Sequence, residues 1–260
     1  MSEAEKSPPP EREQRQGEWA SGSGTLRPPS NVSTDDAPNI EGRLPTSPEG
    51  GFGQLWQKDY FATLPIDQSP QELTAYWKRE FGSLWPPGHH YTSAFRSITP
   101  GEVSALDIPV PGGTRLASGV RVLHADDTSF TLQTAEGHMF AGWIQFSVSG
   151  EPRNLIAHVQ VTMRASDPLY EIGLRLGGHD REDWFWSYAL REMSERFGVE
   201  PRVSIRHRLL DRRVRWKAIG NIRHNAWIRT MLHRLTLPIR RLIRRLRGQP
   251  EVAPPAAQGR

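Results

Sequence analysis

Histidine side chains are the first candidates for chemistry, because imidazole acts as a base or a metal ligand near neutral pH. His89 and His90 are adjacent, and adjacent residues of an extended chain point in opposite directions, which predicts an exposed loop pair rather than a chelate. His138 and His158 fall in two segments predicted to be neighbouring strands. His158 shares its strand face with polar residues, as is typical of a half-solvated sheet face. We therefore predict no metal site and name no catalytic residue.

Carboxylates form no acid–base pair that their spacing would support. Asp126–Asp127 lies in a predicted turn, where Asp side chains accept hydrogen bonds from their own backbone. Glu182–Asp183 lies in the first turn of a predicted helix, where the helix dipole favours negative charge. Glu171 and Arg175 are candidates for a cavity mouth, with an ordinary salt bridge as the simpler interpretation.

Composition excludes several further kinds of chemistry. The chain of 260 residues has no cysteine, which excludes disulfides, thiolate nucleophiles and cysteine-based zinc or iron–sulfur sites. Motifs of metalloproteases, serine hydrolases, phosphate loops, dinucleotide folds and calcium loops are absent from the sequence, and we predict no cofactor. The N-terminus lacks the apolar run of a secretory signal, and no run of about 18 apolar residues occurs. We therefore expect a cytoplasmic protein.

The elements that would position a site follow in the order strand, helix, several strands, long helix. Residues 55–64 are rich in aromatic residues and predict a first strand. Ser69 and Pro70 predict the start of a helix that runs to about Phe81. The hydrophobic period then changes to two, which predicts strands at residues 91–98, 103–108, 114–124, 129–135, 138–149 and 154–165. Their short connections contain Gly, Pro and Asp, which predicts hairpins and an antiparallel meander.

The last two predicted strands and the helix after them give the clearest patterns. Apolar and more polar residues alternate along both strands, as expected of a curved sheet with one face on a core. Asp180 is the expected cap of a helix that runs through Phe197 and stops at Gly198. Trp186 and Met193 belong to the apolar stripe of this helix.

This order of elements resembles the SRPBCC superfamily, in which START-like helix-grip domains wrap a curved antiparallel sheet around a long C-terminal helix. The local sequences of residues 130–138, 142–146 and 164–168 look most similar to those of uncharacterised bacterial members. The resemblance covers residues 53–200 and implies an α+β helix-grip fold with a cavity. It implies no catalytic residue, because the superfamily shares no catalytic signature.

Large apolar residues would surround the space between this sheet and its helix, and such a space suits an apolar small molecule or a lipid. The candidates for ligand contact are Phe140, Ile144, Phe146, Val159, Val161, Met163, Trp186 and Met193. A filled hydrophobic core explains the same residues equally well. The sequence therefore leaves open whether the space is a cavity.

Composition divides the chain into four parts. Residues 1–52 contain few large apolar residues and many prolines and glycines, which predicts a disordered N-terminal region before the domain at 53–200. A basic amphipathic helical extension is expected at 201–247, and a disordered C-terminus at 248–260. Residues 202–247 contain fifteen Lys or Arg and one acid, while the whole chain has a formal net charge of +4. The extension is therefore expected to meet an anionic partner.

The extension has a sharp amphipathic pattern. On a helical wheel that starts at Ile228, the apolar residues gather within about 60° and the arginines lie at about 100° or beyond. Pro238 is expected to split the segment into two helices, and Leu237 is out of register. The candidates for membrane contact are Trp227, Ile228, Leu232, Leu235, Arg240, Arg241, Leu242, Arg244 and Arg245.

Three interpretations of the extension remain open. We favour a peripheral position on an anionic membrane, at its inner face, because the apolar stripe needs a partner as well as the arginines. The stripe packing on the domain or on a second subunit is the second interpretation. Nucleic-acid binding is the third, although it leaves the stripe unexplained.

The function that we expect is the binding of an apolar small molecule or lipid in the cavity, with the extension on a membrane. The first alternative is an enzyme of the cyclase or dehydratase kind that uses polar cavity residues such as His158 or Arg164. The second is a regulatory or structural module whose basic extension binds a protein or nucleic acid. We lean toward a binding protein because no motif supports catalysis.

Overall fold

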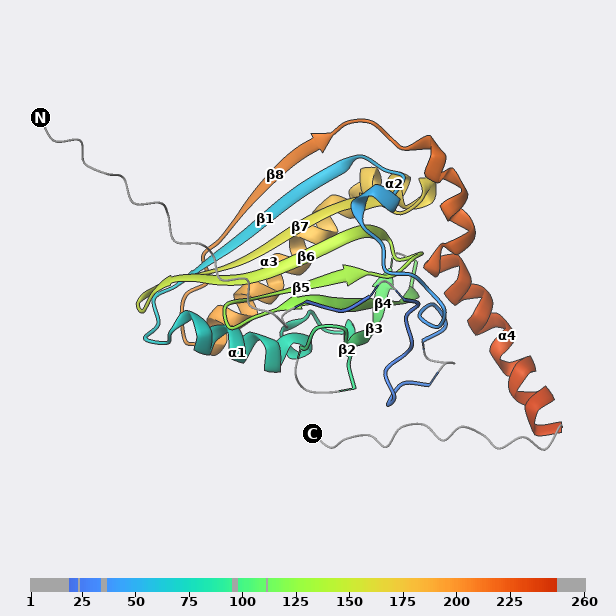
Figure 1. Cartoon of the computed structure of the whole chain (residues 1–260), viewed down its shortest axis with the longest axis horizontal. Helices are drawn as coiled ribbons and strands as arrows, with labels where there is room; N and C mark the ends of the chain where they lie inside the picture. Colours follow the sequence, from blue (N-terminus) through green and yellow to red (C-terminus); the bar gives the residue numbers. More distant parts are fainter. Residues whose placement is uncertain (1–18, 23, 34–36, 95–97, 111, 247–260) are drawn as a thin grey trace, which may run out of the picture.

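One large antiparallel sheet organises the molecule. The structure is a computed structural model that describes residues 19–22, 24–33, 37–94, 98–110 and 112–246, and of residues 239–246 it describes the helix only (Figure 1). Within these residues eight strands form one sheet in the order β2-β3-β4-β5-β6-β7-β1-β8. The strands are β1 (Leu55–Leu64), β2 (His90–Thr92), β3 (Val103–Val110), β4 (Thr114–Ala125), β5 (Ser129–Thr134), β6 (Phe140–Glu151), β7 (Asn154–Ala165) and β8 (Val203–Asp211).

The described residues also form four α-helices and four shorter helical segments. They are α1 (Pro70–Glu80), α2 (Pro168–Gly173), α3 (His179–Arg196) and α4 (Ala226–Leu246), with 3₁₀ turns η1 (Pro48–Gly50), η2 (Phe81–Leu84) and η4 (Trp216–His224) and a π-type segment η3 (Leu174–Gly178). Ser69 caps α1 in a reciprocal capping box with Glu72, as its sequence predicts. Asp167 caps α2, a helix that was not predicted from the sequence pattern. Asp180 lies in the first turn of α3 rather than at its cap.

The predicted α+β helix-grip architecture is confirmed. α3 packs against one face of the curved sheet (Figure 1). Large apolar side chains fill most of the space between them. Tyr60 of β1, Phe146 of β6 and Leu190 of α3 are fully buried there. The alternation predicted for β6 and β7 is what places one apolar face of each strand on this core.

The prediction of a disordered region over residues 1–52 is wrong for its described part, and residues 1–18 lie outside the described residues. Leu26 and Ile40 are buried in a small second core together with Ala105 and Ala135 of the sheet. Ile40 lies over Gly119, where an added Cβ would come within 2.8 Å of its side chain. Few apolar residues are needed here, because the segment uses an existing sheet face instead of building its own core.

The prediction of a helical extension from residue 201 is wrong for its first part, because residues 203–211 form β8. This strand pairs in antiparallel register with β1, for example His207 opposite Lys58. Its sequence alternates Val203, Ile205 and His207 with Ser204 and Arg206, which is a period of two hidden by the basic charge. The amphipathic helix begins only at Ala226. The predicted disorder at 248–260 lies outside the described residues.

α4 is one continuous helix, so the prediction that Pro238 splits it is wrong. Pro238 lies inside the helix, where its ring removes one backbone donor but the flanking turns continue. The Thr236 hydroxyl donates to the Leu232 carbonyl at 2.9 Å within this stretch. In the described part of the chain, no helix combines the length and the apolar character that a membrane crossing requires.

Candidate functional site

A cavity of about 590 Å³ lies between the sheet and the α2–η3–α3 segment. Side chains from β3, β4, β5 and β6 form its floor, and α3 covers it. Most of the lining is apolar: Trp85, Leu106, Ile108, Pro109, Val110, Val120, Leu132, Met139, Phe140, Ile144, Leu169, Leu174, Leu176, Phe185, Trp186 and Trp227. This volume lies within the range of small-molecule sites, which is about 300–1,000 Å³.

The eight predicted ligand-contact residues divide into two groups. Phe140, Ile144 and Trp186 line the cavity. The other five are buried in the packed core and are absent from the lining: Phe146, Val159, Val161, Met163 and Met193. The two alternatives left open by the sequence therefore each describe one part of the space. The space between the sheet and α3 is filled by side chains at β7 and β1, and it is a cavity toward β3 and β4.

Sequence reasoning missed the cavity residues of the first strands. Leu106, Ile108 and Val110 of β3 alternate along one face of the strand and line the cavity together. Their period of two was a signal that could have found them. It was weak because β3 was predicted only as a short strand.

The α2–α3 connection forms the mouth of the cavity. Leu176 lines the cavity although its side chain is 81% exposed, which places an opening beside it. The helical path breaks at this point, because Leu176 and Gly177 have non-helical backbone angles and the φ of Gly177 is 104°. Only glycine adopts such a φ without strain. Gly177 therefore lets the chain turn from α2 into α3 around the opening.

The polar groups of the cavity include two histidines whose pKa values are lowered by burial. Burial lowers the pKa of His138 to about 4, against an ordinary value of about 6.5. The backbone N–H of Phe140 donates to Nδ1 of His138 at 3.0 Å, which leaves Nε2 to carry the proton. Burial also lowers the pKa of His89, whose Nδ1 lies 3.2 Å from the Pro86 carbonyl oxygen. These side chains give the cavity hydrogen-bonding groups without charge.

A buried ionic cluster stands at one side of the cavity. Lys58 is fully buried, and its Nζ donates to Asp183 at 2.9 Å and lies 3.1 Å from Glu182. The contact with Glu182 is an ion pair without hydrogen-bond geometry, so both carboxylate oxygens of Glu182 lack a hydrogen-bond donor. Burial raises the pKa of Glu182 to about 7, although the charge of Lys58 acts in the opposite direction. Tyr60 donates to Asp183 at 2.7 Å.

This cluster connects β1 to the start of α3. Burial raises the pKa of Asp183, but hydrogen bonds from Lys58 and Tyr60 outweigh burial and lower the pKa overall. His207 of β8 lies 3.1 Å from the same carboxylate. In the part of the chain that the structure describes, no three His, Asp or Glu side chains are grouped to hold a metal ion. The cluster is therefore an anchor for α3 that borders the cavity through Glu182.

The two residues named for a catalytic alternative do not reach the cavity. His158 lies on the outer sheet face, where its Nε2 is 2.9 Å from Asp59 and its ring stacks on Phe61. Arg164 donates to the backbone carbonyls of Gly53 and Arg213 and to Asp211. Both side chains hold elements together, and neither belongs to the cavity lining.

The start of α4 is fixed beside the cavity mouth by a chain of hydrogen bonds. The side-chain oxygen Oδ1 of Asn225 caps α4 by accepting from the Ile228 N–H at 3.0 Å, and the side-chain Nδ2 of Asn225 donates to Asp167 at 2.8 Å. The same Asp167 caps α2, so one carboxylate connects two helix starts. Tyr170 of α2 accepts from the Trp227 N–H at 3.0 Å.

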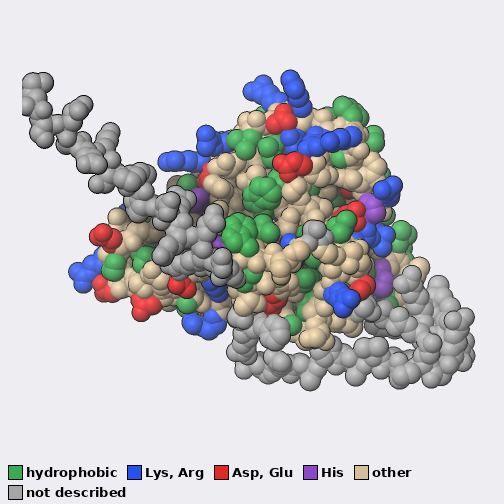
Figure 2. Space-filling view, viewed as in Figure 1, with side chains coloured by type: hydrophobic (Ala, Val, Ile, Leu, Met, Phe, Trp, Pro, Cys, Tyr) green, Lys and Arg blue, Asp and Glu red, His purple; other side chains and the backbone are tan. Residues whose placement is uncertain are grey.

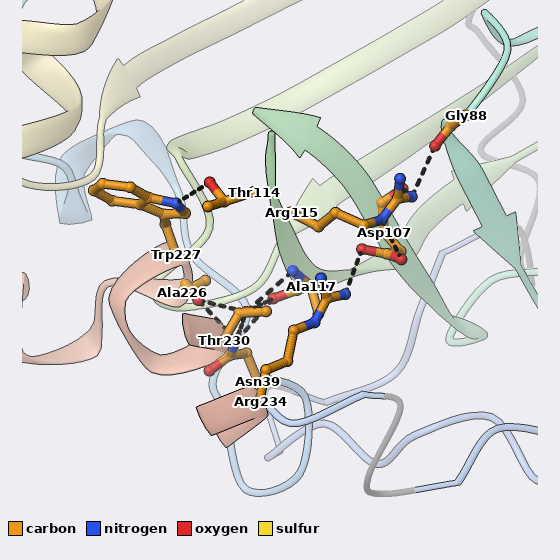
Figure 3. A network of polar contacts seen from close by, with 10 residues as sticks. All are labelled: Asn39, Gly88, Asp107, Thr114, Arg115, Ala117, Ala226, Trp227, Thr230 and Arg234. Carbon is orange, nitrogen blue, oxygen red and sulfur yellow. Dashed lines mark hydrogen bonds and ion pairs between the residues drawn. The ribbon is translucent and has the colours of Figure 1, made fainter. Parts of the chain in front are cut away.

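The first turns of α4 pack on β4 through their small and polar face. The amide of Asn39 donates to the Ala117 carbonyl at 2.8 Å and to the Thr230 hydroxyl at 3.0 Å, while the Ala117 N–H donates to Thr230 (Figure 3). Ala226 and Thr230 are buried at this contact. A second, smaller pocket lies on this same side, between α4 and strands β3 and β4. Leu237, which is out of register with the apolar stripe, lines it.

The apolar stripe of α4 consequently faces away from the domain. Thr230 lies at about 200° from Ile228 on the helical wheel, whereas Leu232 and Leu235 lie within about 40° of Ile228. Leu232 is 57% exposed and Leu235 is 71% exposed. The interpretation in which this stripe packs on its own domain is therefore wrong for the described residues, because hydrogen bonds and small side chains take that position.

The other membrane-contact candidates have different surroundings. Trp227 is half-buried and turned inward, since it lines the cavity and its indole N–H donates to Thr114 at 2.9 Å (Figure 3). Its contact with a membrane stays a prediction. Ile228 is half-buried. The remaining candidates belong to the described helix, but their side chains lie outside the described residues: Arg240, Arg241, Leu242, Arg244 and Arg245.

Comparisons with known proteins give distant structural similarities. No family model and no curated protein sequence matches the chain. Protein Ms6760 from Mycobacterium smegmatis is 15% identical with a TM-score of 0.41, over 55% of this chain and 90% of that one. The ginseng major latex-like protein 151 from Panax ginseng is 12% identical with a TM-score of 0.35, over 55% and 98%.

The di-domain ARO/CYC protein StfQ from the steffimycin biosynthetic pathway is 12% identical with a TM-score of 0.41. The similarity covers 56% of this chain and 53% of StfQ, so this chain spans about half of that protein. At these identities and TM-scores, none of the similarities assigns a function to this chain.

Proposed function

We propose that the protein binds an apolar small molecule or lipid in the helix-grip cavity and associates with an anionic membrane through α4. The observation that carries the first half is the cavity of about 590 Å³, whose lining is mostly apolar. Burying the apolar surface of a ligand there stabilises the complex by a free energy of roughly 25 cal/mol per Å². The neutral side chains of His138 and His89 supply hydrogen bonds without the cost of burying a charge.

Native mass spectrometry of the purified full-length chain tests ligand binding directly. We expect masses above that of the bare chain, with a released molecule that is extracted by organic solvent. The dye N-phenyl-1-naphthylamine, added to delipidated protein, is the matched solution probe, and its fluorescence is expected to rise on binding. Absence of both a retained molecule and dye binding would contradict a ligand cavity.

The second half of the proposal is supported by the outward direction of the α4 stripe. Leu232 and Leu235 are exposed on a helix whose other side is held by Asn39 and Thr230. A basic helix with an exposed apolar stripe binds the boundary between lipid headgroups and acyl chains. Nucleic-acid binding uses the arginines alone and gives no role to the leucines.

Co-sedimentation with vesicles tests the α4 contact. We expect the chain to bind phosphatidylcholine vesicles that contain 30% phosphatidylglycerol, and to bind pure phosphatidylcholine vesicles at least about tenfold more weakly. The double substitution L232S/L235S should reduce binding to the anionic vesicles. If it left binding unchanged, α4 would not be the contact.

A further inference from the structure

The 3₁₀ helix η4 presents three chemically different rows of side chains. In a 3₁₀ helix the residues at i and i+3 lie directly above one another, so Trp216–His224 forms three rows. One row is Ala218, Asn221 and His224. A second is Trp216, Ile219 and Ile222. The third is Lys217, Gly220 and Arg223.

The first row attaches η4 to the domain. Ala218 is buried, and the Asn221 amide donates to the carbonyls of Gly50 and Ser166 at 2.8 and 2.9 Å. His224 lies 2.7 Å from Arg43 and 3.5 Å from Glu136. Residues from three separate parts of the chain therefore hold this row, and the rotation of η4 about its axis is fixed.

The second row is apolar and faces solvent as a consequence. Trp216 is 68% exposed, Ile219 is 51% exposed and Ile222 is 45% exposed. Three large apolar residues on one short element, at the spacing that aligns them, form a continuous strip rather than scattered surface residues. We call Trp216, Ile219 and Ile222 the apolar row.

Exposed basic side chains lie beside the apolar row. Lys217 and Arg223 of the third row are exposed beside it, and Arg212 and Arg213 precede η4 as exposed residues. Asp211 is the nearest acid in sequence, and it already binds Arg164 at 2.6 Å. In Figure 2, Lys and Arg side chains gather along the top of the view together with hydrophobic ones, and a few Asp or Glu side chains lie among them.

We infer that η4 is a membrane-binding element in its own right, with the apolar row inserted among the acyl chains and Lys217 and Arg223 on anionic headgroups. Charge complementarity selects this occupant, because a basic rim around an apolar strip matches an anionic headgroup layer above hydrocarbon. Tryptophan at the end of the strip suits the interface, where its ring is apolar and its N–H stays hydrated. This inference deepens the membrane part of the proposed function and adds a contact independent of α4.

The experiment compares three variants of the full-length chain on vesicles of phosphatidylcholine with 30% phosphatidylglycerol. W216S/I219S/I222S removes the apolar row, L232S/L235S removes the α4 contact, and W184S/I205S removes two exposed apolar residues of α3 and β8 as a control. We expect the first variant to bind at least about tenfold more weakly and the control to bind as the parent does. Circular dichroism of each variant checks that the fold is retained.

Fluorescence gives a second measurement that needs only one conservative substitution. Brominated acyl chains quench tryptophan only when it enters the hydrocarbon layer, so the parent is expected to be quenched and W216F to lose most of that quenching. A chain that binds and is quenched equally in both forms would overturn the η4 inference.

The outcomes separate the two membrane statements. If the parent binds and only L232S/L235S weakens binding, η4 is not a contact while α4 remains one. If only W216S/I219S/I222S weakens binding, η4 is supported and the α4 half of the proposed function fails. If the parent binds no anionic vesicles, both fail, and the ligand cavity is unaffected because its test uses no membrane.

Discussion

The cavity and the C-terminal surface, formed by the exposed residues of η4 and α4, both leave large apolar side chains unpacked by the chain itself. Their polar neighbours differ. Burial keeps His138 in the cavity neutral, whereas Lys217 and Arg223 beside the apolar row are exposed cations. A mostly apolar cavity between the sheet and α3 suits a molecule that buries most of its surface. An exposed strip with cations beside it suits a layered partner that is anionic outside and apolar inside.

The two regions also meet physically. Trp227 lines the cavity, and the residue before it, Ala226, donates its N–H to the Gly137 carbonyl at 2.8 Å. Asp167 caps α2 at the cavity and holds Asn225 at the start of α4. A change at this junction is therefore expected to affect the two regions together, while changes on either side should affect them separately.

The largest effect is expected from substituting Gly137, at the junction. Its φ is +86°, and an added Cβ would collide with the His224 carbonyl oxygen. G137A is therefore expected to lower the free energy of unfolding by about 3 kcal/mol or more, and to release η4 and α4. Chemical denaturation measures the first effect, and hydrogen exchange of residues 216–238 measures the second.

Gly101 offers the matched control for this substitution. Its φ is +89°, but an added Cβ there would meet no atom within 4 Å. G101A should cost only the backbone strain, about 1 kcal/mol, and should leave exchange at η4 and α4 unchanged. Equal effects of the two substitutions would show that the close approach at the junction is unimportant.

The next effect is a dependence of stability on pH that distinguishes the cavity from the exposed surface. The pKa of His138 falls from about 6.5 to about 4 on folding, so the folded state binds fewer protons and stability rises between pH 4 and 6.5. The contribution is at most about 3 kcal/mol. H138N keeps an acceptor for the Phe140 N–H without titrating, so its stability should rise less over this range in urea denaturation.

Glu182 is expected to affect the pH dependence of stability in the opposite direction, over an overlapping pH range. Its pKa rises from 4.5 to about 7 on folding, so the folded state binds more protons and this contribution is lost as the pH rises through that range. E182Q is therefore expected to make the rise of stability with pH steeper, where H138N makes it shallower. If both variants changed the slope in the same direction, the assignment of the two buried groups would be wrong.

The sequence predicted the sheet and α3 because these elements carry their own periodic signals. The alternation in residues 140–165 and the stripe of Trp186 and Met193 are local patterns that survive in the fold. The helix-grip architecture followed from their order. The position of the cavity did not follow, because Phe146 and Ile144 are equivalent in the pattern, and only the packing of α1 and α3 decides which of them faces a space.

Long-range hydrogen bonds explain the predictions that were wrong. The sequence places the apolar stripe of α4 correctly on one face of a helix, but it gives no sign of which face meets the domain. That choice depends on Asn39, 191 positions before Thr230, in a segment predicted to be disordered. β8 was missed for a related reason, since its arginines were interpreted as part of a basic extension rather than as the solvent face of an edge strand.

A smaller effect is expected from filling the cavity. Ile144 lines the cavity from β6, and I144W should occupy part of its volume and weaken dye binding at least about tenfold, with less than about 1.5 kcal/mol change in stability. V161A is the control, because Val161 pairs with Ile144 across the strands but lies in the filled core. It should cost about 1–2 kcal/mol of stability and leave dye affinity unchanged. Reversed effects would place the cavity at β7 rather than toward β3 and β4.

The smallest effect concerns what holds α4 in its orientation. Arg234 lies 3.4 Å from Asp107 of β3, but the pair is partly exposed and Asp107 already binds Arg115 at 2.7 Å (Figure 3). Exposed ion pairs contribute about 0.5 kcal/mol, so R234Q should barely change thermal stability or the exchange of α4. The orientation instead follows from the buried contacts of Thr230 with Asn39 and Ala117, which no counterion screens. If R234Q freed the helix, the outward direction of Leu232 and Leu235 would depend on charge, and high salt would be expected to turn the stripe away from a membrane.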